Sequence, residues 1–131
     1  MTELEQVLRK EFSRAARYRE PLAVLLLDLQ PTGELLGAIR DGVRLCDCVV
    51  PDGPDRVAMI LPETPLAGAI QVGTRLGGVL APPGGPEPSA GMAIGIGVFP
   101  SALATDAAAL LRCAAAALEQ ARSRGGGVAV R

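Results

Sequence analysis

Residues 22–29 read Leu-Ala-Val-Leu-Leu-Leu-Asp-Leu and are apolar at every position except Asp28. A short apolar run without alternation is typical of a strand that is covered on both faces of a sheet. We therefore expect this strand to lie at the centre of the fold, with the Asp28 carboxylate at its end.

The residues before this strand predict an amphipathic helix. From Thr2 to Tyr18, apolar side chains recur at helical spacing between charged ones, so residues 1–18 are expected to form an N-terminal amphipathic helix. Thr2 followed three positions later by Glu5 has the pattern of a capping box, which favours a helix start at this point.

The residues after the strand predict a short helix and then a hairpin. The helix is expected to begin after residues 31–33 and to end near Leu45. Residues 51–54, Pro-Asp-Gly-Pro, stand between apolar runs at 46–50 and 56–61. Asp-Gly at such a point supplies the positive φ that a tight reversal needs.

The second half of the chain predicts two more helices and two more strands. A glycine-containing helix at 65–80 is followed by a Pro/Gly-rich loop at 81–88 and by a strand at 89–98. Glycines within that strand predict close approach of another element. Thr105 is expected to cap an alanine-rich helix to about Arg122, before a last strand at 128–130.

This order of elements predicts an α/β fold with a mixed central sheet flanked by helices. The 131 residues, 49% of them hydrophobic, suit one core and leave little room for a second, so residues 1–131 are expected to form a single domain.

Composition excludes several classes of function. A formal charge of −1 gives no general attraction to nucleic acid or to an anionic membrane, so neither partner is expected. The absence of histidine excludes Ser-His-Asp, Cys-His and His-zinc chemistry. The longest apolar run is too short to span a bilayer.

The three cysteines, Cys46, Cys48 and Cys113, fit neither a disulfide framework nor a zinc site. They favour a reducing, cytoplasmic location. Cys46 and Cys48 would share one face of a strand, and we interpret them as small buried hydrophobic residues rather than a redox pair.

Four blocks of the sequence, taken in order, resemble those of GGDEF (diguanylate cyclase) domains. They are the helix and strand at 11–29, the hairpin at 47–64, the Ala-Ile-Gly-Ile-Gly strand from Ala93, and the closing helix at 110–125. The resemblance implies the mixed sheet of that family. It also implies a chemistry in which two facing domains, each with one GTP and bound metal ions, form cyclic di-GMP.

The signature turn of that family is altered in this chain. Its five positions are occupied by Gly53, Pro54, Asp55, Arg56 and Val57. The resemblance assigns metal binding to Asp28 and Asp55, but Arg56 replaces a carboxylate, and a fixed cation weakens both Mg²⁺ binding and activation of the attacking hydroxyl. Pro54 lacks the N–H of the glycine it replaces. We therefore predict that the vestigial Asp28 and Asp55 hold no metal and that no cofactor is bound. We also predict that the turn at 51–54 reverses the chain and has no further role.

The guanine-binding region implied by the resemblance is shortened. Only residues 29–33 separate Asp28 from the next helix, which leaves no counterpart for the base-reading residues. In the closing helix, Ala115 and Glu119 replace an aspartate and a tyrosine, and Arg122 replaces a phosphate-binding lysine. We predict no catalytic residues and no enzyme activity.

One binding motif of the family is retained. Arg44-Leu-Cys-Asp47 is an RxxD at the distance before the turn where the family's inhibitory site binds cyclic di-GMP, and Arg75 falls where some members place a second arginine. Arginine can donate to guanine O6 and N7, and a carboxylate can accept from base N–H groups. The pattern alone is common by chance, and Arg44 with Asp47 could equally form a surface ion pair.

Three hypotheses remain. The leading one is a catalytically inactive GGDEF-like regulatory module that binds cyclic di-GMP through Arg44, Asp47 and Arg75. The alternative is a protein-interaction or dimerisation module without nucleotide binding. A residual diguanylate cyclase is the third. A protein partner or self-association is expected, because GGDEF domains usually follow another module and the helix at 2–18 could dock on one.

Overall fold

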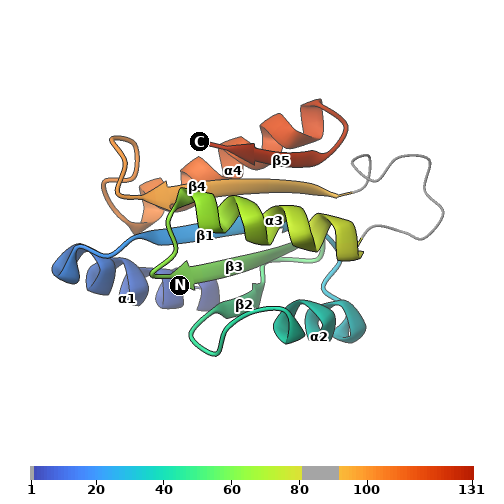
Figure 1. The fold of residues 1–131 in the computed structure, drawn as a ribbon, viewed down its shortest axis with the longest axis horizontal. Helices are drawn as coiled ribbons and strands as arrows, with labels where there is room; N and C mark the ends of the chain where they lie inside the picture. The colour runs from blue at the N-terminus through green and yellow to red at the C-terminus, as the bar shows by residue number, and fades with distance from the viewer. Residues whose placement is uncertain (1, 81–91) are drawn as a thin grey trace.

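A computed structural model describes residues 2–80 and 92–131 of the chain. These residues form four helices and five strands (Figure 1). The elements are α1 (Glu3–Tyr18), β1 (Leu22–Asp28), α2 (Gly33–Asp41), β2 (Cys48–Pro51), β3 (Arg56–Pro62), α3 (Leu66–Leu80), β4 (Ala93–Phe99), α4 (Ala107–Ser123) and β5 (Gly127–Val130).

The strands form one mixed sheet in the order β2-β3-β1-β4-β5. Strand β1 is the central strand and pairs antiparallel with both β3 and β4, while β5 adds parallel to β4. All six residues from Leu22 to Leu27 are buried, and Asp28 is exposed. The predicted central strand and the predicted mixed sheet are therefore confirmed.

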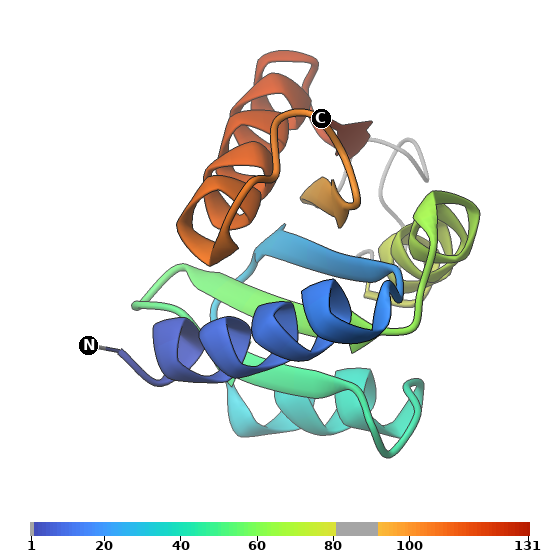
Figure 2. The ribbon, with the colours of Figure 1, turned by 90° about the vertical axis from the view of Figure 1, so that its left-hand side faces the viewer.

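Helices cover both faces of the sheet. Side chains of β1 alternate between two cores: Leu22, Val24 and Leu26 pack with α1 and α4, whereas Ala23 and Leu25 pack with α2 and α3. Figures 1 and 2 show α3 on one side of the sheet and α1 and α4 on the other. Among residues 2–80 and 92–131, no helix has both the length and the apolar character needed to cross a bilayer.

The glycines of β4 allow α4 to lie directly on the sheet. A Cβ built at Gly95 would fall 2.7 Å from Leu118 Cα, and one built at Gly97 would fall 2.8 Å from the Leu110 carbonyl oxygen. Real Cβ atoms do not approach backbone this closely, so these positions require glycine. The close approach predicted over this strand is confirmed.

Three predicted boundaries are wrong. Helix α2 ends at Asp41 rather than near Leu45, because Gly42 is its C-cap. Strand β2 begins at Cys48, so Cys46 is exposed and is not a strand residue. Asp106, not Thr105, caps α4: its side chain accepts a hydrogen bond from Ala109 N, 2.7 Å away.

Two other predicted features are confirmed, whereas the strand predicted at 89–98 begins, within the described residues, only at Ala93 and ends at Phe99. Thr2 Oγ1 accepts a hydrogen bond from Glu5 N at the start of α1, as the capping pattern predicts. Gly53 has φ of +81°, the positive value expected of the hairpin turn. The loop predicted at 81–88 lies outside the described residues.

Candidate functional site

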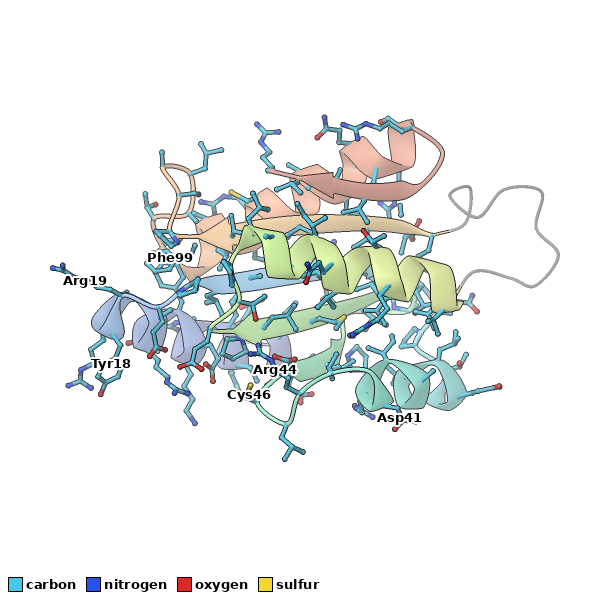
Figure 3. All side chains as sticks on the ribbon, in the orientation of Figure 1. Tyr18, Arg19, Asp41, Arg44, Cys46 and Phe99 are labelled. Atoms are coloured by element: carbon cyan, nitrogen blue, oxygen red, sulfur yellow. The ribbon has the colours of Figure 1, made fainter. Side chains whose placement is uncertain are left out.

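Arg44 is fixed by contacts on both sides of its guanidinium group. It lies on the loop between α2 and β2 (Figure 3), where Nη2 donates to the Pro62 carbonyl at 2.7 Å and to Thr64 Oγ1 at 2.6 Å. Thr64 is itself buried, with 7% of its surface exposed, and donates to the same carbonyl. The end of β3 therefore holds the guanidinium in place, although half of the Arg44 side chain (51%) stays exposed.

Asp47 pairs with Arg44 through three hydrogen bonds. Asp47 Oδ2 accepts from the backbone N–H of Arg44 at 2.9 Å and from its Nε at 3.4 Å, while Oδ1 accepts from Nη2 at 3.0 Å. Only 4% of the Asp47 side chain is exposed. This carboxylate is therefore turned inward, onto Arg44, rather than toward solvent.

Arg75 approaches the same loop from helix α3. Its Nη2 donates to the carbonyl of Gly42, the C-cap of α2, which lies 33 residues earlier in the chain, so this contact links α3 to the end of α2. Arg44, Asp47 and Arg75, which the sequence singles out together, all line one open cavity of about 630 Å³. The structure thus brings the three predicted residues to one place.

The carboxylates around Arg44 stabilise its charged form further. The hydrogen bonds that Arg44 donates to Asp47 raise the pKa of its guanidinium, and the negative charges of Asp47 and Glu63 act in the same direction, against the opposing effect of burial. A permanently charged, half-exposed fork is suited to an anion or to the acceptor edge of a base.

Two further residues of this cavity were missed in the sequence. Thr64 orients Arg44, and Glu63 lies on the rim with a backbone φ of +53°. A left-handed conformation is uncommon outside glycine. No sequence signal marks Glu63, because only the folded path of the chain between β3 and α3 imposes this conformation.

The altered signature turn is closed by an internal ion pair. Arg56 Nε donates to Asp52 Oδ2 at 2.7 Å, across the turn that contains Gly53 and Pro54. Val57 is fully buried in the core beneath α3, and Asp55 is exposed. Arg56 lies opposite Asp28 in the register of β3 and β1, so a cation stands beside the first vestigial carboxylate.

The Asp28 carboxylate forms an ion pair with a cationic side chain of helix α4. Arg122 donates to both carboxylate oxygens, with Nε 3.2 Å from Oδ2 and Nη2 3.1 Å from Oδ1, and also pairs with Glu119. Asp28 and Glu119 raise the pKa of the Arg122 guanidinium. In the described part of the chain, no group of three or more Asp, Glu, Cys or His side chains could hold a metal. The residues present therefore do not fit the Mg²⁺ site that the fold implies.

The comparisons identify the class of domain. No protein-family model and no curated protein matches the sequence. Among solved structures, the chain is similar to the GGDEF domain of YfiN (TpbB) from Pseudomonas aeruginosa, with a TM-score of 0.78 and 26% identity over 97% of this chain and 93% of that one. It is also similar to the active GGEEF domain of a diguanylate cyclase from Vibrio cholerae, with a TM-score of 0.79 and 18% identity over 98% and 96%.

A third similar structure contains a ligand. It is the GGDEF domain of DgcB from Caulobacter crescentus in complex with cyclic di-GMP, with a TM-score of 0.76 and 14% identity over 95% of this chain and 86% of that one. The fold, the altered signature turn and these similarities together define the chain as a GGDEF-like domain.

Proposed function

We propose that this chain is a catalytically inactive GGDEF-like regulatory module that binds cyclic di-GMP in the cavity formed by Arg44, Asp47 and Arg75. The observation that carries the proposal is the convergence of these three residues, two from the α2–β2 loop and one from α3, on one cavity. A binding site needs donors held in place before the ligand arrives, and Arg44 is held by Asp47, Pro62 and Thr64.

The size and chemistry of the cavity support a nucleotide. Pockets for small molecules commonly have volumes of roughly 300–1,000 Å³. The cavity at Arg44, of about 630 Å³, falls within this range. Arg44 and Arg75 bring two positive charges to it, which suits a ligand with two phosphates. Relatives of the same fold bind cyclic di-GMP, as the DgcB complex does.

The surroundings of the Asp28 carboxylate support the proposed loss of catalysis. A metal at Asp28 would have to displace Arg122, which already meets both carboxylate oxygens. Arg56, in register with Asp28, would repel the same ion. Since phosphoryl-transfer chemistry of this kind needs a metal to neutralise developing charge, we propose that GTP is not converted.

The alternative is an interaction or dimerisation module with no ligand. One observation favours it: Arg44 and Asp47 satisfy each other, as an inherited structural ion pair would. Leu45 between them is fully exposed and could contact a partner protein. The three free cysteines remain consistent with the cytoplasmic location that we predict.

Calorimetric titration with cyclic di-GMP separates these two functions. We expect micromolar binding that is lost in Arg44→Ala and weakened in Arg75→Ala. Arg112→Ala, an exposed arginine of α4, is the matched control and should bind as the wild type does. Thermal melting of each variant checks that it is folded. Absence of heat at high ligand concentration would leave the interaction module standing.

Incubation with GTP and Mg²⁺ tests the residual cyclase. We expect no cyclic di-GMP by chromatography. Formation of product that Asp55→Ala abolishes would show that the altered turn still supports catalysis, and the proposed loss of activity would be wrong.

A further inference from the structure

The predicted binding site lacks its expected acceptor. A guanine base presents O6 and N7 as acceptors and N1–H with the exocyclic amine as donors, so a site for it needs a carboxylate as well as an arginine. Asp47 was the expected carboxylate. Both of its oxygens already accept from Arg44, and only 4% of its side chain is exposed.

Glu63 is a carboxylate on the rim of the same cavity. It is exposed and, within the part of the chain that the structure describes, makes no hydrogen bond and no ion pair within 4 Å. Arg44 lines the same cavity as Glu63. Glu63 is therefore an acceptor without a donor, beside a donor that is only partly used.

The backbone at Glu63 indicates that its position is imposed. Its φ of +53° is left-handed, and among the described residues only Arg19 and Glu63 adopt a positive φ without being glycine. Such conformations cost free energy and are enriched at ligand sites. The next residue, Thr64, is buried and holds Arg44, so the same segment positions both the donor and the free carboxylate.

The geometry points to Glu63, rather than Asp47, as the residue that accepts hydrogen bonds from the N1–H and exocyclic amine of a guanine base. This inference rests on the proposed function. The Arg44 contacts within the described residues use Nε and Nη2, which leaves Nη1 to donate to O6. Asp47 is then a positioning residue, which holds Arg44 and does not touch the ligand.

In this role Glu63 determines which base the site accepts. Adenine has no N–H at position 1, so it cannot give a carboxylate two hydrogen bonds. Hypoxanthine keeps N1–H and lacks the exocyclic amine, so it differs from guanine by the single donor that Glu63 would read. A carboxylate that the bound ligand covers and leaves without its donor weakens binding of the analogue.

The test compares two ligands across three variants by calorimetry. Wild-type protein is expected to bind cyclic di-GMP about tenfold more tightly than cyclic di-IMP, the analogue with two hypoxanthines. Glu63→Gln should reduce this ratio to near one, whereas Asp47→Asn should weaken both ligands and keep the ratio. Glu34→Gln, an exposed glutamate of α2, is the control and should keep both affinities.

The outcomes separate the two proposals. If Glu63→Gln keeps the tenfold ratio and Asp47→Asn removes it, Asp47 reads the base and the inference is wrong, while the proposed function stands. If wild-type protein binds neither ligand, the proposed function is wrong and the inference fails with it. Loss of the ratio in Glu63→Gln alone supports both.

Discussion

Arg122 donates hydrogen bonds to both carboxylate oxygens of Asp28, at 3.2 Å and 3.1 Å, although the two residues are 94 positions apart in the chain. This contact joins the end of the central strand to the last turn of α4. The resemblance to GGDEF domains implies that Asp28 stands at the position of a metal ligand. Here an internal cation takes the place that the resemblance gives to Mg²⁺.

Metal binding gives the first prediction. Wild-type protein should show no saturable Mn²⁺ site by electron paramagnetic resonance, because Arg122 occupies Asp28 and Arg56 lies opposite it in register. The double variant Arg56→Glu with Arg122→Ala removes both cations and adds a carboxylate, so it should gain Mn²⁺ binding. Arg124→Ala, outside the site, is the control. Mn²⁺ binding by wild-type protein that Asp28→Asn removes would contradict this account.

The ion pair itself should add little stability. Arg122 and Asp28 are 39% and 38% exposed, and pairs in such settings contribute about 0.5 kcal/mol. A double-mutant cycle of Asp28→Asn and Arg122→Gln, measured by urea unfolding, should give a coupling free energy below about 1 kcal/mol. A coupling of several kcal/mol would mean that the pair is a structural element of the fold.

Contact between β4 and α4 should be far more sensitive. Gly95→Ala would place a methyl group against the backbone of α4, 2.7 Å from Leu118 Cα. Overpacking of this kind costs about 3 kcal/mol in the free energy of unfolding. Gly37→Ala is the matched control, since no atom lies within 4 Å of a Cβ there, and in the middle of α2 it should stabilise by about 1 kcal/mol. Equal unfolding midpoints for the two variants would show that α4 does not rest on Gly95.

Cysteine reactivity tests the α2–β2 boundary. Exposed Cys46 should be alkylated first, then half-buried Cys48, and buried Cys113 last. Burial, followed by the charge of Glu11, raises the pKa of the Cys48 thiol above its ordinary 9.0. Since the thiolate is the reactive form, Cys48 alkylation should still be rising as the pH passes 9.0.

The sign of the linked stability follows from the same shift. The folded state holds the Cys48 thiol neutral, so its contribution to stability is complete below pH 9.0 and is lost as the pH rises above that value.

Mass spectrometry of alkylated peptides gives the order in which the three cysteines react. Faster labelling of Cys48 than of Cys46 would show that β2 begins earlier than Cys48.

Local sequence patterns predicted much of this fold. The unbroken apolar run at 22–29 indicated the central strand, Asp52-Gly53 indicated the hairpin turn, and the glycines of β4 indicated close packing. Each depends on properties of neighbouring residues. The predicted end of α2 was a few residues too late, and the predicted cap of α4 was one residue too early. In each case several neighbouring residues could end or cap the helix, and tertiary contacts select among them.

The candidate site was only partly predictable. Arg44, Asp47 and Arg75 were found through the family resemblance, but their roles depend on contacts across the chain. Arg44 donates to Thr64 twenty residues away, and the Asp47 side chain that pairs with Arg44 is only 4% exposed. A positive φ at a glutamate has no local sequence signature.

The central claim is that a site for the cyclic product persists while the site for the substrate is lost. One calorimetric comparison tests it most directly: separate titrations of wild-type protein with cyclic di-GMP and with GTP in the presence of Mg²⁺. The account predicts saturable heat with cyclic di-GMP and none with GTP. Saturable heat with GTP and Mg²⁺ that Asp28→Asn abolishes, together with none from cyclic di-GMP, would contradict it.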